Sequence, residues 1–188
     1  MALTPSNMIP LGTPAPRFEL KDESSEKMIK LEDYAGKKAV VVMFICNHCP
    51  YVKHINEGLV NLTRSYEKNK DVAFIAINAN DAKNYPDDSP EKMKLAAKKL
   101  GYNFPYCFDE SQEIAKAYQA ACTPDFYILD SQLKIAYRGQ MDDSRPANGI
   151  PVTGNDLKAA IESLLSGKPV SSNQKASIGC NIKWVTTT

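Results

Sequence analysis

Two unbroken apolar runs are separated by one amphipathic segment in the first half of the chain. Residues 39–45 read Ala-Val-Val-Val-Met-Phe-Ile, and residues 71–77 read Asp-Val-Ala-Phe-Ile-Ala-Ile. Apolar, β-branched runs without a period predict fully buried strands. Between them, apolar positions from Val52 to Tyr66 recur at steps of three and four, which predicts an amphipathic helix over about residues 49–68. Together the three segments predict a strand–helix–strand unit with parallel pairing and a right-handed crossover.

Weaker signals predict further elements on either side of this unit. Residues 17–20 and 27–31 are typical of two short strands joined by a charged turn. Ser89-Pro90 is a helix start, with serine as the cap and proline in the first position, and Gly101 ends that helix. A short extended segment is expected over residues 104–108.

The second half of the chain predicts a strand hairpin between two helices. Asp109 is expected to cap a helix that runs to about Tyr118. Residues 125–130 and 133–138 flank Ser131-Gln132, which favours a hairpin. Thr153-x-x-Asp156 resembles a capping box that opens a last helix. The alternation of strands and helices indicates an α/β fold with a central mixed sheet flanked by helices.

The length and composition favour one globular domain. The chain has 188 residues, of which 43% are hydrophobic and 24% are charged. We expect an irregular, proline-rich lead-in over residues 1–16, the main domain over residues 17–170, and a tail over residues 171–188. Ile178, Ile182 and Trp184 give this tail apolar side chains with which to pack on the domain.

The charge distribution argues against two classes of partner. The net charge is +1, and lysine and arginine are scattered along the chain, so neither nucleic acid nor a membrane surface is an expected partner. The lead-in lacks the pattern of a secretory signal, and no apolar stretch approaches the length of a membrane span. We therefore expect a cytoplasmic protein, in which a Cys-x-x-Cys pair more often indicates catalysis or metal binding than a permanent disulfide.

Cys46 and Cys49 lie where the buried strand passes into the helix. The first N–H groups of a helix are unpaired and favour an anion, which here would be a thiolate. The thiolate is the form of cysteine that attacks disulfides and peroxides. A Cys-x-x-Cys pair can also close on itself, so that one sulfur attacks a partner and the other resolves the mixed disulfide.

Three motifs together resemble the redoxin branch of the thioredoxin fold. They are Cys46-Asn47-His48-Cys49-Pro50-Tyr51-Val52, then Thr123-Pro124 before a strand, and a late Gly-Cys-Asn-Ile-Lys-Trp that contains Cys180. The resemblance extends from about residue 17 to residue 184, and the nearest group is the peroxiredoxin-like AhpC/TSA group. It implies a cis peptide bond at Thr123-Pro124, with this loop against the Cys46–Cys49 pair. Cys122 would then be a third thiol near the pair, or simply a buried apolar residue.

The resemblance implies two competing chemistries. In thioredoxin-like disulfide exchange, Cys46 is the nucleophile and Cys49 resolves, while His48 between them stabilises the Cys46 thiolate. In a peroxiredoxin-like thiol peroxidase with an antioxidant role, Cys49-Pro50 matches the peroxidatic Cys-Pro, and Cys46 or Cys180 resolves. The peroxide-activating arginine of such enzymes is not apparent near Pro124.

A third hypothesis is a redox-sensing or metal-binding module without turnover. One Cys-x-x-Cys and two histidines offer no second pair of ligands, so we expect neither a metal nor a bound cofactor. The favoured interpretation is a thiol–disulfide oxidoreductase in cell redox homeostasis. Its expected partners are protein or small-molecule disulfides or peroxides, together with a thiol system that donates electrons.

Overall fold

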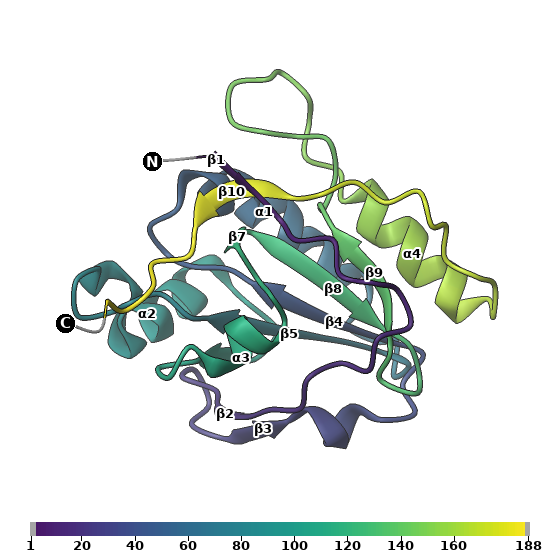
Figure 1. Cartoon of the computed structure of the whole chain (residues 1–188), viewed down its shortest axis with the longest axis horizontal. Helices are drawn as coiled ribbons and strands as arrows, with labels where there is room; N and C mark the ends of the chain where they lie inside the picture. Colours follow the sequence, from purple (N-terminus) through teal and green to yellow (C-terminus); the bar gives the residue numbers. More distant parts are fainter. Residues whose placement is uncertain (1–2, 187–188) are drawn as a thin grey trace.

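A five-stranded mixed sheet forms the centre of the protein (Figure 1). The computed structural model describes residues 3–186, so the outermost two residues of the predicted lead-in and of the predicted tail lie outside the described residues. The strand order is β6-β5-β4-β8-β9, in which β4–β5 and β5–β6 are parallel and the other pairs are antiparallel. The strands are β4 (Ala39–Phe44), β5 (Val72–Asn78), β6 (Tyr106–Phe108), β8 (Asp125–Leu129) and β9 (Ile135–Gly139).

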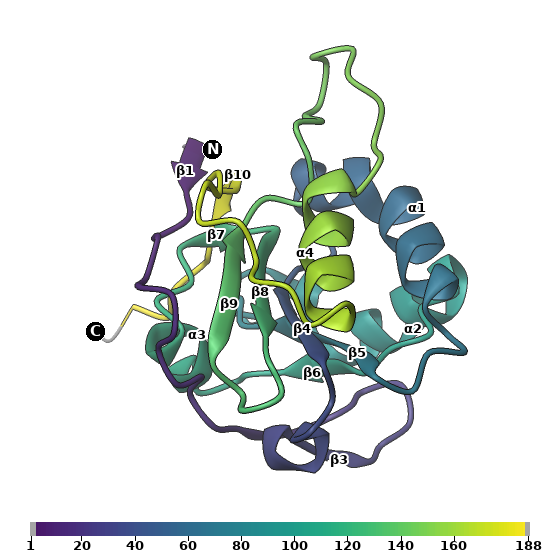
Figure 2. The same ribbon diagram turned by 90° about the vertical axis from the view of Figure 1, so that its right-hand side faces the viewer.

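Both faces of strand β4 are covered, which explains its unbroken apolar sequence. Val41 and Met43 belong to the core under helices α1 (Pro50–Ser65) and α4 (Asn155–Leu165). Val40, Val42 and Phe44 belong to a second core, on the side of the short helix α3 (Glu113–Ala117). Figure 2 shows α1 and α4 on one side of the sheet and α3 on the other. The predicted strand–helix–strand unit and the predicted α/β class are thus confirmed.

Helix α2 (Pro90–Leu100) begins and ends where the sequence indicates. The side chain of Ser89 accepts a hydrogen bond from the backbone N–H of Lys92, and Pro90 occupies the first helical position. Gly101 ends the helix in the left-handed conformation, at φ 70°. The hairpin of β8 and β9 is also confirmed.

Two predicted helix starts are wrong. The Asp109 carboxylate accepts a hydrogen bond from Ala115 N, but α3 begins only after Gln112, whose left-handed backbone (φ 63°) prevents an earlier start. The Thr153 hydroxyl accepts a hydrogen bond from Asn155 N at 3.4 Å, but Thr153 is not the cap residue of α4, because Gly154 occupies that position. Instead, the backbone N–H groups of Thr153 and Gly154 donate to the carboxylate of Asp142, at 2.7 and 2.6 Å. The carboxylate comes from 11 residues before Thr153, earlier in the same loop, so a capping-box motif of four residues could not reveal it.

Smaller elements complete the domain. Strands β2 (Glu19–Lys21) and β3 (Met28–Lys30) form the expected antiparallel pair, shifted slightly from the predicted bounds. Two 3₁₀ turns, η1 (Leu31–Tyr34) and η2 (Pro86–Asp88), follow β3 and precede α2. The segment between β9 and α4 is a loop that projects from the body of the molecule.

Two strands near opposite ends of the chain pair with each other beside the central sheet. Strand β1 (Leu3–Pro5) pairs with β10 (Ile178–Asn181), and β10 pairs in turn with β7 (Cys122–Thr123). The lead-in is therefore not irregular throughout, because its strand partner comes from the opposite end of the chain. Of the tail side chains expected to pack inward, Ile182 is buried, whereas Ile178 and Trp184 are each about two-fifths exposed.

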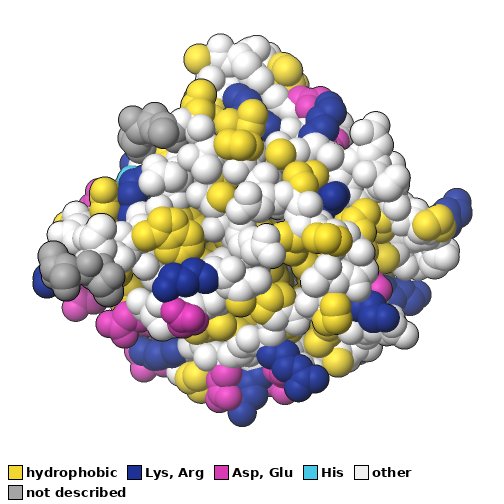
Figure 3. All heavy atoms as spheres, viewed as in Figure 1, with side chains coloured by type: hydrophobic (Ala, Val, Ile, Leu, Met, Phe, Trp, Pro, Cys, Tyr) yellow, Lys and Arg dark blue, Asp and Glu magenta, His cyan; other side chains and the backbone are white. Residues whose placement is uncertain are grey.

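The positively charged side chains are dispersed on the surface, as they are along the sequence. On the face shown in Figure 3, lysine and arginine lie among acidic and apolar side chains and do not gather in one basic patch. Within residues 3–186, no helix combines the length and the apolar character that a membrane span requires.

Candidate active site

The Cys46–Cys49 pair lies at the carboxyl end of β4 and the amino end of α1. Cys46 follows the strand, Cys49 is the residue before the first helical position, and Pro50 occupies that position. Proline is tolerated there because its missing N–H would have no partner inside the helix. Both cysteines are almost fully covered, with 2% and 0% of their surfaces exposed.

Thr123 contacts both cysteines of the pair. Its hydroxyl lies 3.3 Å from Cys46 Sγ, and its carbonyl oxygen lies 3.2 Å from Cys49 Sγ, where it can accept a hydrogen bond from the protonated thiol. The Thr123–Pro124 peptide bond is cis. Both the cis bond and the position of this loop agree with what the resemblance implied.

The third thiol at the pair is Cys180 rather than Cys122. Cys180 Sγ lies 2.9 Å from Cys49 Sγ. Cys122 precedes Thr123 in β7, and successive side chains of a strand point to opposite faces. Cys122 Sγ donates to the Pro124 carbonyl oxygen at 3.7 Å, and the residue is fully buried. Its position fits the simpler of the two interpretations, that of a buried apolar residue.

The hydrogen bonds favour a thiolate at Cys49. They lower its pKa to about 4, because the Cys46 thiol, the Cys180 thiol and the backbone N–H of Val52 can all donate to its sulfur. The pKa of Cys46 is raised by its hydrogen bond to Cys49 and by burial. Burial and the contact with Cys49 raise the pKa of Cys180 to about 12. These directions favour a thiolate at Cys49 over one at Cys46 or Cys180.

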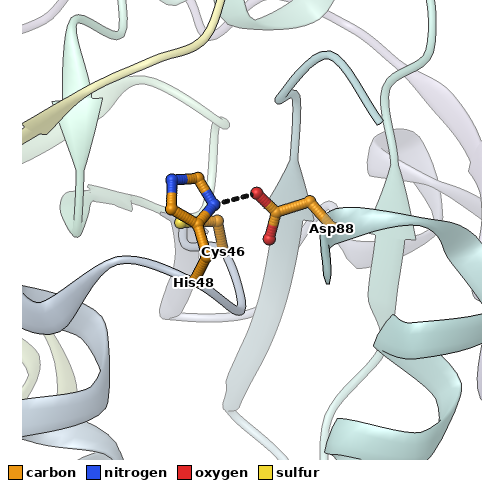
Figure 4. Close-up of side chains that lie close together, drawn as sticks. All are labelled: Cys46, His48 and Asp88. Carbon is orange, nitrogen blue, oxygen red and sulfur yellow. Dashed lines mark hydrogen bonds and ion pairs between the residues drawn. The ribbon is translucent and has the colours of Figure 1, made fainter. Parts of the chain in front are cut away.

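A buried carboxylate, Asp88, fixes the loop between the cysteines. Asp88 accepts hydrogen bonds from Asn47 N at 2.7 Å and from the Asn80 side chain at 2.8 Å. It also pairs with Nδ1 of His48, as Figure 4 shows. The imidazole of His48 is also held by Tyr85, whose ring stacks on it with the ring centroids 5.4 Å apart.

Sequence reasoning missed Asp88. It lies in a polar loop that follows β5, about forty residues after the cysteines, and nothing in the local pattern separates it from Asp87. Only the predicted strand order could have indicated that the loop of Asp88 lies near the cysteines. The loops after neighbouring parallel strands β4 and β5 meet at one edge of the sheet, which is the usual place for functional groups in α/β proteins.

The same residues form a possible donor set for a metal. Cys46 Sγ, a ring nitrogen of His48 and a carboxylate oxygen of Asp88 lie within 4.8 Å of one another. Sulfur, imidazole and carboxylate ligands together would suit zinc. However, Nδ1 of His48 is already paired with Asp88, so an ion using these atoms would have to replace that pair. The expectation that the protein holds no metal stays a prediction.

A surface groove begins at the loop between Cys46 and Cys49. It has a volume of about 730 Å³ and lies between α1 and α2, with Asn47 at the cysteine end. Lys53, Arg64 and Lys99 also line it. The loop between Cys46 and Cys49 therefore borders an open groove at Asn47, whereas Cys180 of β10 contacts the loop at Cys49.

Residues 11–138 match the model of the AhpC/TSA family. The chain belongs to the AhpC/TSA family. An uncharacterized conserved protein from Geobacillus kaustophilus is 57% identical over 100% of this chain and 99% of its own, with a TM-score of 0.97. A hypothetical protein from Sinorhizobium meliloti 1021 is 45% identical over 98% of this chain and 100% of its own, with a TM-score of 0.94. No curated protein sequence matches.

This AhpC/TSA protein has the thioredoxin fold. A thiol:disulfide interchange protein of the thioredoxin family from Chlorobium tepidum TLS shares 18% identity over 82% of this chain and 97% of its own, with a TM-score of 0.63. At that identity the likeness shows the fold alone. The expected family and fold are confirmed, and the family places the protein among thiol oxidoreductases in general.

All four arginines of this AhpC/TSA protein bond to groups away from Cys49. Arg17 pairs with Glu32, and Arg64 donates to the Gly101 carbonyl oxygen. The other two are nearer in sequence to Pro124. Arg138 donates to the Ile9 carbonyl oxygen, and Arg145 to the Gln140 side chain. Cys49 is therefore surrounded by thiols and backbone groups instead of an arginine.

Proposed function

We propose that this protein is a thiol–disulfide oxidoreductase in which Cys46 and Cys49 cycle between dithiol and disulfide. The observation that supports this best is the place of the two buried cysteines, which lie at the amino end of α1 with their sulfur atoms 3.3 and 3.2 Å from oxygen atoms of Thr123. The proposed substrates are protein or small-molecule disulfides, and the proposed electron donor is another thiol system. The cytoplasm stays the proposed compartment.

The electrostatics favour a different order of attack from the one that the sequence suggested. The Cys49 thiolate attacks one sulfur of the substrate disulfide, and the other substrate sulfur leaves as a thiolate. Cys46 then loses its proton and attacks Cys49 of the mixed disulfide, which releases the second substrate thiolate and closes the Cys46–Cys49 disulfide. His48 is the proposed acceptor of the Cys46 proton, because one of its ring nitrogens lies within 4.8 Å of that sulfur, a separation that one water molecule can bridge.

A thiol peroxidase is the second candidate, because the same Cys49 thiolate is suited to attack a peroxide. Water or an alcohol would leave, and the sulfenic acid at Cys49 would be resolved by Cys46 or Cys180. Cleavage of the O–O bond needs donors that stabilise the leaving oxygen. The bonding of all four arginines elsewhere favours disulfide exchange over this reaction.

Two rates measured on the fully reduced protein separate these candidates. One is the rate of reaction with oxidised glutathione and the other is the rate with hydrogen peroxide, with the modified cysteine located by mass spectrometry. We expect fast disulfide exchange and a peroxide reaction no faster than that of a free thiol. Rapid trapping of sulfenic acid at Cys49 would overturn this order and make the protein a peroxidase.

A non-catalytic module is the remaining alternative. Metal ligation stabilises a folded protein by mass action, so a zinc site should raise the melting temperature when zinc is added and lower it with chelator. We expect an unchanged melting temperature in both cases. A redox sensor would be distinguished by stoichiometric oxidation, whereas an enzyme consumes reductant over many cycles.

A further inference from the structure

Cys49 and Cys180 bring two sulfur atoms within 2.9 Å of each other, although they lie far apart in the sequence. Both side chains are buried, with 0% and 3% of their surfaces exposed. We propose that Cys180 is a third redox thiol, which forms a disulfide with Cys49 in exchange with the Cys46–Cys49 disulfide. The proposal rests on the proposed function, since it needs an oxidised active-site pair.

Strand pairing fixes the position of Cys180. In the antiparallel pairing of β10 and β7, Cys180 lies opposite Thr123, the residue that contacts both active-site cysteines. Leu3 of β1 lies opposite Cys180 on the other edge of β10. The tail strand is thus held from both sides, as Figure 1 shows, and its cysteine is not part of a loose terminus.

Gly179 allows the tail to approach this closely. A Cβ atom at position 179 would lie 2.0 Å from the Thr123 carbonyl oxygen, which is far closer than atoms can pack. On the other side of Cys180, Ile182 is 1% exposed, and its N–H donates to the Ala121 carbonyl oxygen at 3.1 Å. The backbone of the tail is therefore seated against the loop that contacts the cysteine pair.

The exchange conserves atoms and electrons within the chain. It starts from the Cys46–Cys49 disulfide that substrate oxidation leaves behind. Cys180 loses its proton and attacks Cys49 Sγ, the Cys46–Cys49 bond breaks, and the Cys49–Cys180 bond forms. The Cys46 sulfur leaves as a thiolate and takes up a proton. No net oxidation occurs, but Cys46 returns to its thiol form while the oxidising equivalent moves to the tail.

Peptide mapping after oxidation can count both disulfides. Reduced protein is treated with one equivalent of oxidised glutathione, quenched with acid, alkylated and digested with trypsin without reductant. Cleavage after lysine leaves both Cys46 and Cys49 in the peptide 39–53, and Cys180 in the peptide 176–183. An internal Cys46–Cys49 disulfide and a link between the two peptides are then distinguished by mass. We expect both species in the unaltered protein, with alkylated Cys46 in the linked one.

Three variants isolate the proposed step. Cys46→Ser should form the linked peptide in nearly every chain. Gly179→Ala keeps all five cysteines, and it should reduce the linked peptide at least tenfold while the internal disulfide persists. Cys107→Ser removes a buried thiol from the other core, which lies on the opposite face of the sheet from Cys46, Cys49 and Cys180, and should match the unaltered protein.

The outcomes separate this proposal from the proposed function. If Cys46→Ser accumulates glutathione on Cys49 without the linked peptide, Cys180 is not a redox thiol and the proposal is overturned. Cys180→Ser tests the Cys46–Cys49 pair alone, because it removes the third thiol in contact with that pair. Failure of that disulfide in Cys180→Ser would count against the proposed function instead.

Discussion

Asp88 and His48 form a carboxylate–imidazole pair beside Cys46. The carboxylate is fully buried, and it also accepts hydrogen bonds from Asn47 N and the Asn80 side chain. A loop outside the Cys-x-x-Cys motif thereby sets the conformation of the motif. The carboxylate also contributes negative charge near Cys46, which raises the pKa of that thiol.

Replacing this carboxylate should destabilise the protein and ease ionisation of Cys46. Asp88→Asn leaves buried donors without a full set of acceptors, so we expect a loss of about 1–3 kcal/mol in the free energy of unfolding. The pKa of Cys46 should fall, because the negative charge beside it is removed. Urea unfolding and thiolate absorbance at 240 nm measure the two effects. Asp87→Asn is the matched control, since Asp87 is exposed, and equal effects from both variants would contradict the role of Asp88.

The low pKa of Cys49 predicts a thiolate that persists in acid. Absorbance of the reduced protein at 240 nm should stay constant as the pH falls from 7 to 5, and drop near the pKa of about 4. Cys49→Ser should abolish this transition. A transition near pH 9 in its place would show that the helix terminus and the neighbouring thiols do not stabilise the thiolate.

The same shift predicts how stability depends on pH. Between about pH 4 and the ordinary value of 9.0, folded Cys49 has released a proton that the unfolded chain still binds. The free energy of unfolding should therefore rise with pH across this window. The contribution of Cys49 to it should disappear as the pH falls to about 4. Comparing urea unfolding of the reduced protein with Cys49→Ser at pH 5 and pH 8 isolates this contribution. A difference between the two proteins that does not change with pH would refute it.

The hydroxyl of Thr123 should tune the reactivity of Cys46. It lies 3.3 Å from Cys46 Sγ, and its hydrogen bond lowers the pKa of that thiol. Thr123→Val removes the bond and keeps the shape, so resolution of the mixed disulfide should slow by roughly five- to tenfold, the equivalent of about 1 kcal/mol. Thr123→Ser keeps the hydroxyl and should restore most of the rate. The readout is single-turnover release of glutathione. Equal rates in both variants would show that the hydrogen bond from Thr123 does not affect the resolution step.

Burial of Ile182 should anchor the tail. Ile182→Ala removes a side chain that is 1% exposed, and we expect a loss of about 2–5 kcal/mol in the free energy of unfolding. Alkylation of Cys180 in the native protein should become faster, because β10, the strand that contains Cys180, is held less firmly. Val185→Ala, at a position that is 53% exposed, is the control and should change stability by less than about 0.5 kcal/mol. Unchanged alkylation in a destabilised Ile182→Ala would show that the tail is held elsewhere.

The central fold follows from local patterns in the sequence. The apolar run of β4, the helical period of α1 and the apolar run of β5 each specify their element without distant information. The serine cap and the glycine end of α2 do the same. The sequence also determined where Cys46 and Cys49 lie, because a strand that passes directly into a helix fixes their place at the helix terminus.

Only the tertiary structure decided what surrounds those cysteines. Asp88 reaches the motif from the loop after β5, Thr123 from β7, and Cys180 from a strand at the far end of the chain. The start of α4 after Gly154 also depends on Asp142, 12 residues before that glycine, and the pairing of β1 with β10 depends on a strand at the opposite end of the chain. Local patterns encode the burial of each element, whereas the protonation of a thiol depends on the charges and donors that folding brings within a few ångströms.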